Sequence, residues 1–334
     1  MNNCNLVVWL ITGKCDLKCR HCYASRFNDL NELSTEDAIK VIKGLIEINA
    51  NHISFTGGEP TLRKDLPILI SEAYDYGFEL SVVTNALTLS SNLMRLFARK
   101  DVEVQVSIDG VTKDTFTKIR GPYFELLLEK IRKIKAFGAN IRPIMTINKL
   151  NYNEIVEYVK LCFNIGAVGA ALIPLIPIGR ADVSILPTSN IIKNAIISVD
   201  QIAEELKFNV EVWCAPFLSA IIKTKRVTIC PCMIKEALDI APDGSVMICD
   251  SLNIKVCNIL DGVKEAWNKY LEHELVKKLS FPKLLNNICK DCKYLEVCIG
   301  GCHARANAIY NDPTMPDPLC PLIKPIKSTT KYSL

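Results

Sequence analysis

The sequence lacks the segments that would place the chain in a membrane or carry it across one. No basic region precedes an apolar stretch at the amino terminus, and the first apolar run, Leu6–Ile11, is far too short to span a bilayer. Charge or proline interrupts every later apolar run. We therefore expect a soluble cytoplasmic protein that does not bind membranes. The net charge of +4 is small and its lysines are spread along predicted helices, so no nucleic-acid partner is predicted.

Cysteine, by contrast, is abundant. The chain has 15 cysteines in 334 residues and no signal peptide, which favours metal binding over disulfide bonds. The hydrophobic fraction of 49% is enough for a large core and predicts one large domain with a smaller one.

Three of the cysteines form a compact group directly after the apolar run. Cys15, Cys19 and Cys22 are separated by three and then two residues, on a loop that leaves a predicted strand. Three thiolates can hold three irons of a cubane cluster and leave the fourth open to a substrate. A zinc knuckle that includes His21 is the alternative, but His21 adjoins Cys22, whereas paired zinc ligands normally have at least two intervening residues.

A glycine pair follows the next predicted strand. His52–Thr56 runs directly into Gly57, Gly58, Glu59 and Pro60. Glycines at a strand's carboxyl end let the backbone turn and approach a ligand closely, and Glu59 is suited to bind an ammonium group. Together with the cysteine triad, this segment resembles the radical S-adenosylmethionine (SAM) superfamily, whose signatures are Cys-x3-Cys-x2-Cys with a nearby aromatic residue, here Tyr23, and Gly-Gly-Glu-Pro.

That resemblance implies a fold and a chemistry. Strand-like and helix-like patterns alternate through the first two hundred residues, which indicates a parallel sheet with right-handed crossovers. The pattern alone fits a doubly wound open sheet equally well, and the resemblance favours an open six-stranded (β/α)6 barrel. The predicted strands are Leu6–Thr12, His52–Thr56, Phe78–Thr84, Val102–Ile108, Ile141–Ile147 and Ala170–Leu175.

The resemblance further implies that the triad binds a 4Fe–4S cluster whose open iron is chelated by SAM, which the reduced cluster cleaves to a 5′-deoxyadenosyl radical. Polar residues at the carboxyl ends of the strands match positions that bind SAM in related enzymes. The predicted SAM contacts are Tyr23, Gly57, Gly58, Glu59, Pro60, Asn85, Ser107, Asp109 and Arg120. Arg180 also matches a family position and is suited to pair with a carboxylate of SAM or of the substrate.

A second cysteine pattern near the carboxyl terminus resembles the SPASM extension of this superfamily. It implies a barrel over residues 1–205 and a SPASM domain over 206–334. By this resemblance two auxiliary 4Fe–4S clusters are expected, the outer one on Cys289, Cys292, Cys298 and Cys320, and the inner one on Cys249, Cys302 and two ligands from the region of Cys230 and Cys232. Only one proline separates Cys230 from Cys232, closer than the family's usual pair, so Cys214 is an alternative ligand. For the four-cysteine block Cys289, Cys292, Cys298 and Cys302 taken alone, a structural zinc site is the alternative.

The resemblance leaves the substrate open. Its SPASM members modify peptides and proteins or act on porphyrin precursors of haem, and the sequence predicts a peptide or protein substrate, with the haem precursor as the alternative. Partners are then the peptide or small-molecule substrate and a reductant such as ferredoxin or flavodoxin. A non-catalytic iron–sulfur electron carrier is the competing class of protein, and Gly57–Pro60 disfavours it because a carrier needs no SAM site.

Overall fold

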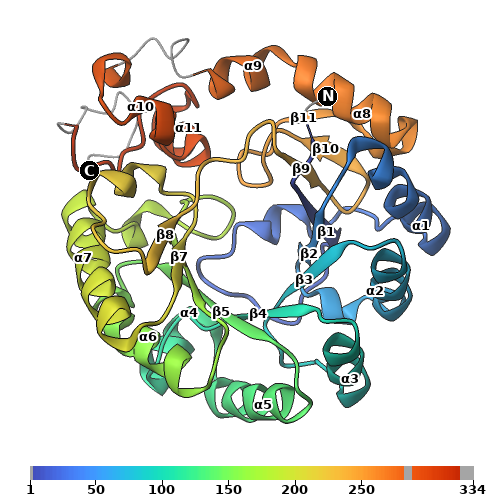
Figure 1. The fold of residues 1–334 in the computed structure, drawn as a ribbon, viewed down its shortest axis with the longest axis horizontal. Coiled ribbons are helices and arrows are strands. Elements are labelled where there is room, and N and C mark those ends of the chain that lie inside the picture. The colour runs from blue at the N-terminus through green and yellow to red at the C-terminus, as the bar shows by residue number, and fades with distance from the viewer. Residues whose placement is uncertain (1–2, 282–287, 324–334) are drawn as a thin grey trace.

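A curved sheet of eleven strands forms the centre of the computed structural model, which describes residues 3–281 and 288–323. The strand order is β11-β10-β9-β1-β2-β3-β4-β5-β6-β7-β8. Strands β1 to β8 are parallel and follow one another in chain order, so each connection crosses over on the outside of the sheet. Figure 1 shows the ring of helices outside the curved sheet.

The predicted α/β fold is confirmed. The first six strands are β1 (Leu6–Thr12), β2 (His52–Gly57), β3 (Glu79–Thr84), β4 (Glu103–Ser107), β5 (Ile141–Ile147) and β6 (Ala170–Pro174). The helices between and after them are α1 (Thr35–Gly44), α2 (Leu66–Asp75), α3 (Ser91–Arg99), α4 (Lys113–Arg120), α5 (Phe124–Ala136), α6 (Ile155–Asn164) and α7 (Ser189–Leu206).

The sheet does not stop at the sixth strand. β7 (Val210–Val212) and β8 (Val227–Ile229) extend it at one edge, and β9 (Ala237–Ile240) pairs in parallel with β1 at the other. β10 (Ser245–Met247) and β11 (Lys255–Asn258) complete it as antiparallel strands. The sheet is therefore continuous across residue 205, and the domain boundary there remains a prediction.

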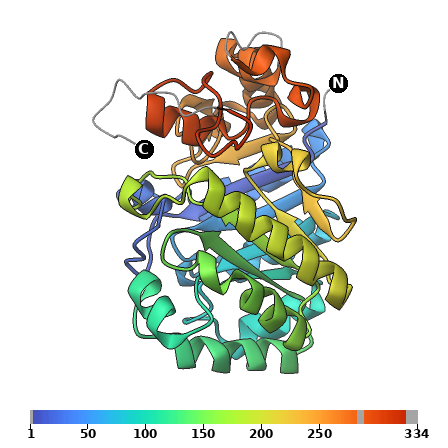
Figure 2. The same ribbon diagram turned by 90° about the vertical axis from the view of Figure 1, so that its left-hand side faces the viewer.

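The carboxyl-terminal region contains α8 (Val263–Glu272), α9 (Glu274–Ser280), α10 (Leu295–Cys298) and α11 (His303–Tyr310). α8 packs against the short 3-10 helix η2 (Leu45–Ile48) near β2, whereas α10 packs against η6 (Pro216–Ala220), which follows β7. This region therefore connects the two open edges of the curved sheet, as Figure 2 shows for its orange and red segments.

One hydrophobic core joins the barrel to this region. Val263, Ala266, Trp267 and Tyr270 are buried at the spacing of one helical face, and Trp267 stacks on Tyr270 with ring centroids 5.3 Å apart. α8 is therefore amphipathic and shares the core that also contains Trp9 and Phe55 of the barrel.

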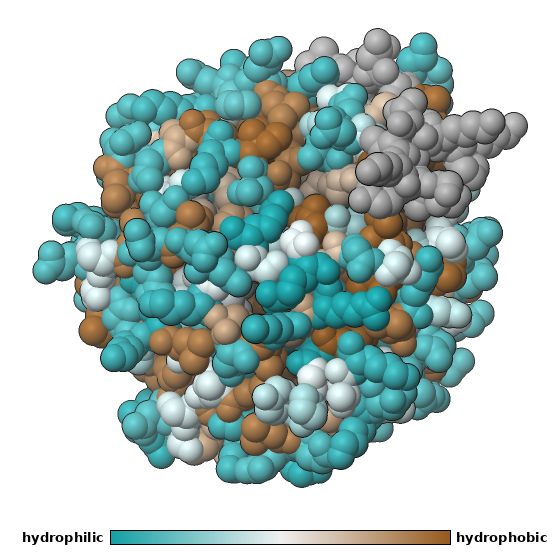
Figure 3. Space-filling model, turned by 180° about the vertical axis from the view of Figure 1, so that it is seen from behind, coloured by the Kyte–Doolittle hydropathy of each residue, from teal (hydrophilic) through white to brown (hydrophobic). Residues whose placement is uncertain are grey.

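Local sequence explains where several helices begin. The Ser34 side chain accepts a hydrogen bond from the backbone N–H of Asp37 and so caps α1, and Ser90 and Thr188 cap α3 and α7 in the same way. Among the helices within the described part of the chain, none combines the length and apolar character that a bilayer crossing needs. The face seen in Figure 3 mixes hydrophilic and hydrophobic residues.

Candidate active site

The cysteine triad lies on the loop that leaves the carboxyl end of β1. Cys15 is exposed, Cys19 is buried and Cys22 is half-buried. Although Cys15 is exposed as a residue, desolvation of its thiol, with smaller contributions from Glu59 and Cys19, raises its pKa to about 12. Burial likewise raises the pKa of Cys19, with a contribution from Cys22. The three thiols are thus gathered at one place, and metal binding there would release their protons.

Two arginines hold the triad loop in place. The Arg120 Nη1 donates to Cys19 Sγ at 3.7 Å, and the Arg180 Nε donates to the carbonyl oxygen of Cys19 at 2.9 Å. The backbone N–H of Arg180 donates to the carbonyl oxygen of Cys22 at 3.0 Å. Both guanidinium groups lower the pKa of Cys19 against the larger, opposite effect of burial. The positive charges therefore favour thiolate at the site where iron would be bound.

The glycine pair after β2 lies directly against this loop. The backbone N–H groups of Gly58 and Glu59 donate to the carbonyl oxygens of Thr12 and Lys14, both at 2.8 Å. A Cβ at Gly57 would lie 2.2 Å from Thr12 O, and one at Gly58 would lie 2.1 Å from Lys14 O. Only glycine permits this approach, so the two sequence motifs form one backbone-lined site.

Glu59 has partners within the chain, and its predicted contact with an ammonium group stays a prediction. Its side chain is fully buried, and its carboxylate accepts hydrogen bonds from Thr61 N and Oγ1, Thr84 Oγ1 and Asn85 N at 2.6–3.1 Å. Burial raises the pKa of Glu59, and these hydrogen bonds oppose the rise. Glu59 thus fixes the end of β3 beside the triad.

A change of Glu59 to glutamine tests this positioning role. The neutral amide oxygen of glutamine is a weaker hydrogen-bond acceptor than the carboxylate. A hydrogen bond to a charged group contributes about 1.5–3 kcal/mol to stability. We expect SAM affinity to fall roughly ten- to hundredfold, with the triad's iron retained. SAM titration of the variant measures this. Glu79→Gln, at a side chain that is 84% exposed, is the control, and equal affinities in the two variants would contradict the role.

Asp109 and Arg120, both predicted to contact SAM, contact each other. The Asp109 carboxylate is buried, pairs with Arg120 Nε, accepts from Thr146 N at 2.6 Å and lies 3.3 Å from His21 Nε2. Despite burial, the charge of Arg120 and these bonds hold the pKa of Asp109 below its ordinary value. Asp109 therefore holds the guanidinium of Arg120 in place, and Arg120 in turn donates to Cys19 Sγ of the triad loop.

The other predicted contacts remain predictions. Asn85 donates from Nδ2 to Asp16 Oδ1 at 2.7 Å, which places it beside Cys15. Ser107 lies half-buried at the end of β4, and Pro60 begins the turn that Glu59 caps. His21, which the sequence suggested only as a zinc ligand, is buried, and burial lowers its pKa to about 4, so it is neutral at pH 7.

A second group of thiols lies between the barrel and the carboxyl-terminal region. It consists of Cys214, Cys232, Cys249 and Cys302. Burial raises the pKa of each thiol, and members of the group raise one another's pKa because they lie close together. They come from four separate segments, after β7, after β8, after β10 and at the start of α11.

Cys230 is not part of this group. Its half-buried thiol faces Glu211 and Arg142, and burial together with Glu211 raises its pKa to about 11. The predicted assignment of Cys230 to the inner site therefore does not fit the geometry, because Cys230 and Cys232 point to different surroundings across Pro231. Cys214 takes the place that the sequence analysis gave to Cys230.

A third group contains the four predicted outer cysteines. The group consists of Cys289, Cys292, Cys298 and Cys320. Burial is the main cause of the raised pKa of Cys289, Cys298 and Cys320. Other thiols of the group also contribute to the rise, which indicates that the four lie close together. They lie on the loop around α10 and on the segment after α11.

Tyr23 connects the triad to the inner group. Its hydroxyl donates to Asp250 Oδ2 at 2.5 Å, and Arg26 Nη2 donates to the carbonyl oxygens of Asp250 and Ser251. Ligand atoms of Asp239, Cys249 and Asp250 lie within 4.8 Å of one another. Tyr23 follows Cys22 and Asp250 follows Cys249, so one hydrogen bond links the two thiol groups. Sequence reasoning missed both aspartates because no motif marks them.

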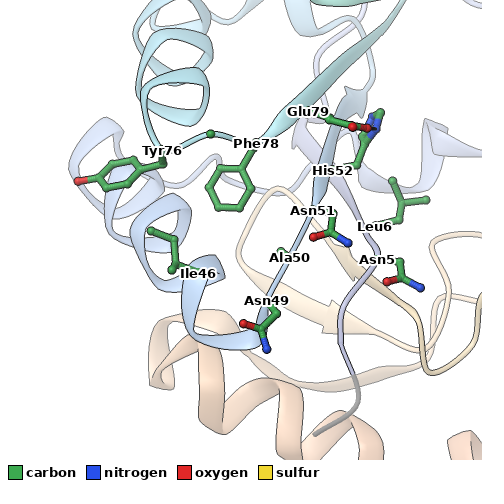
Figure 4. Close-up of a pocket in the computed structure, with 11 residues that line it drawn as sticks. Asn5, Leu6, Ile46, Asn49, Ala50, Asn51, His52, Tyr76, Phe78 and Glu79 are labelled. Carbon is green, nitrogen blue, oxygen red and sulfur yellow. Dashed lines mark ion pairs between the residues drawn. The ribbon is translucent and has the colours of Figure 1, made fainter.

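A pocket of about 740 Å³ lies elsewhere. Asn5, His52, Phe78 and Glu79 are among its lining residues, at the amino ends of the first three strands (Figure 4). The triad follows the carboxyl end of β1, so this pocket lies at the opposite end of the barrel. It is separate from the thiol groups.

A family model matches part of this chain. Residues 9–162 match the model of the Radical SAM superfamily. The chain is a radical SAM enzyme that uses a 4Fe–4S cluster and SAM, with a cysteine-rich carboxyl-terminal region that contains antiparallel strands like the SPASM extension.

Similar proteins extend over nearly the whole chain. An AdoMet-dependent heme synthase of Oleidesulfovibrio alaskensis is 26% identical over 95% of this chain and 87% of its own length. An Fe-coproporphyrin III synthase of Methanosarcina barkeri is 28% identical over 96% of this chain and 88% of its own. The crystal structure of Streptococcus suis SuiB bound to its precursor peptide SuiA has a TM-score of 0.77 at 16% identity, covering 96% of this chain and 77% of SuiB.

Proposed function

We propose that this radical SAM enzyme acts on an iron-bearing tetrapyrrole of haem synthesis. The observation that carries the proposal is the similarity to the two tetrapyrrole enzymes, which covers 95% and 96% of this chain. The peptide substrate that the sequence analysis favoured has less support. The likeness to SuiB, at 16% identity, concerns the fold alone, and the same fold serves different substrates.

The residues around the triad fit the cofactors of this chemistry. A 4Fe–4S cluster held by Cys15, Cys19 and Cys22 would supply the electron that cleaves SAM to methionine and a 5′-deoxyadenosyl radical. The chain's own contribution is positioning. The backbone at Gly57 and Gly58 lines the approach to the open iron, and Glu59 fixes the end of β3, where Asn85 lies.

Arg180 is suited to bind a carboxylate. Its Nε is held by Cys19 O, and within the described residues its two terminal nitrogens have no hydrogen-bond partner. A planar guanidinium pairs well with a carboxylate, and both SAM and the propionate side chains of tetrapyrroles carry one. Arg180 is thus proposed to hold a carboxylate beside the triad.

The two further thiol groups are proposed to bind auxiliary 4Fe–4S clusters. The inner set is Cys214, Cys232, Cys249 and Cys302, and the outer set is Cys289, Cys292, Cys298 and Cys320. Clusters at these places would accept an electron during an oxidative reaction, and an external ferredoxin or flavodoxin would supply the reducing electron at the triad. The inner group adjoins the triad through Tyr23 and Asp250, which favours electron exchange between them.

Substrate titration tests the proposed function. Iron-coproporphyrin III is added to anaerobically reconstituted, dithionite-reduced protein with SAM, and 5′-deoxyadenosine and the mass of the tetrapyrrole are measured. We expect release of 5′-deoxyadenosine to rise several-fold and the tetrapyrrole to change mass. An unrelated short peptide is the control. An unchanged tetrapyrrole, with no change in its absorption spectrum on mixing with the protein, would refute the substrate class.

A further inference from the structure

Arg305 on α11 is a fully buried arginine whose hydrogen bonds cross between the two parts of the chain. Its side chain has 0% exposure. Its Nε donates to Leu175 O at 2.9 Å and its Nη2 to Pro174 O at 2.8 Å, both at the carboxyl end of β6. Burying a guanidinium is costly unless charge and hydrogen bonds compensate it, so each partner of Arg305 matters.

Arg305 also contacts two members of the inner thiol group. Its backbone N–H donates to Cys302 Sγ at 3.4 Å, and its Nη1 and Nη2 donate to the carbonyl oxygen of Cys214 at 3.3 and 3.2 Å. Cys214 has a φ of +54°, a left-handed conformation that residues with a side chain rarely adopt. The two bonds from Arg305 stabilise that conformation, which sets the direction of the Cys214 side chain.

Asp317 completes this arrangement and balances part of the charge. Its Oδ2 accepts from Arg305 Nη1 at 2.5 Å and from the backbone N–H of Cys302 at 2.9 Å. Asp317 thereby orients the guanidinium and fixes the start of α11. The positive charge of Arg305 is close enough to oppose the effect of burial on the pKa of Cys214 and Cys302.

We propose that Arg305 is a positioning residue for the inner thiol group, whose side chain orients Cys214 and sets a fixed positive charge beside the cluster that the group holds. The inference rests on the proposed inner cluster. A buried positive charge stabilises the more negative, reduced state of a cluster, so Arg305 raises its reduction potential. A residue that only docks the carboxyl-terminal region onto the barrel would leave that potential unchanged.

Redox titration of two variants tests this role. Arg305→Gln removes the charge, and Arg305→Lys retains it while losing the forked geometry. Both are made in full-length protein in which Cys15, Cys19 and Cys22 are alanine, so that only auxiliary clusters contribute to the electron paramagnetic resonance signal. We expect the glutamine variant to shift the potential of one cluster to more negative values and the lysine variant to restore most of it.

Arg63 supplies a matched control. It is also a buried arginine, donating to Ile11 O and Leu33 O at 2.8 and 2.9 Å and pairing with Asp65, but it contacts no cysteine. Equal potentials in Arg305→Gln and Arg63→Gln would refute the role of Arg305. If Arg305→Gln yields no folded protein, the test uses Arg305→Lys instead. One cluster of this variant should then lose its iron to a chelator several-fold faster than the same cluster in Arg63→Lys, and equal rates would refute the role. A protein with intact Arg305 but without the inner cluster signal would refute the auxiliary cluster itself.

Discussion

Replacing Cys15, Cys19 and Cys22 together by alanine is expected to abolish SAM cleavage while most of the iron stays bound. The reason is that the inner and outer thiol groups contain no member of the triad. Three clusters of four irons give about twelve iron atoms per chain, and the triple variant should retain about eight. Iron assay, Mössbauer spectroscopy and release of 5′-deoxyadenosine measure the two effects independently.

The chain offers a control with the same number of cysteines removed. Cys4 and Cys162 are fully buried in the core, and Cys257 lies half-buried on β11, outside the three thiol groups. Changing these three to alanine should leave iron content and SAM cleavage unchanged, at a modest cost in stability. SAM cleavage by the triad variant, or loss of all its iron, would show that the thiol groups are not independent sites.

The sequence was most informative where structure depends on local pattern. Strands β1 to β6 are runs of apolar, β-branched residues bounded by turn residues, and their predicted bounds lie close to the observed ones. The cap of α1 is also local, because it is a hydrogen bond between Ser34 and Asp37, three residues further along the chain. The cysteine triad and Gly57–Gly58 are short segments whose chemistry lies in residue type and spacing, so both could be identified before the fold was known.

The later strands could not be predicted in the same way. β7, β8 and β10 have three residues each, too few for an alternating pattern to be recognised, and pairing with longer neighbours determines them. The pairing of β9 with β1 brings residues more than two hundred positions apart together.

Site residues that act through others escaped sequence reasoning for a related reason. Glu59 and Asp109 were both predicted to contact SAM, and those contacts stay predictions. The structure adds that Glu59 accepts from Asn85 N and that Asp109 pairs with Arg120. Those donors come from other strands, and single-sequence spacing contains no information about them.

The inner thiol group shows the same limit. Cys230 and Cys232 form a close pair in sequence, but the Cys230 thiol lies near Arg142 and Glu211. Cys214, eighteen residues before Cys232, reaches the group because its strained backbone is held by Arg305. Tertiary structure, rather than spacing, thus selects the fourth thiol.

The change of Cys214 to alanine is therefore expected to remove the inner cluster, whereas the same change at Cys230 should not. Cys214→Ala takes away one of four thiols that lie together, and the site loses both a ligand and the thiolate charge that holds iron. Iron content should fall from about twelve toward about eight per chain, with loss of one auxiliary cluster signal in electron paramagnetic resonance. SAM cleavage without substrate should continue, because the triad is intact.

Cys230→Ala is the matched control, since it removes a thiol two residues from Cys232 without touching the group. It should retain about twelve iron atoms and both auxiliary signals. The reverse result, in which Cys230→Ala loses a cluster and Cys214→Ala keeps all of its iron, would show that the pair of adjacent cysteines binds the cluster. The turn at Pro231 would then have to rearrange when iron binds, bringing the Cys230 thiol away from Arg142 and toward Cys232.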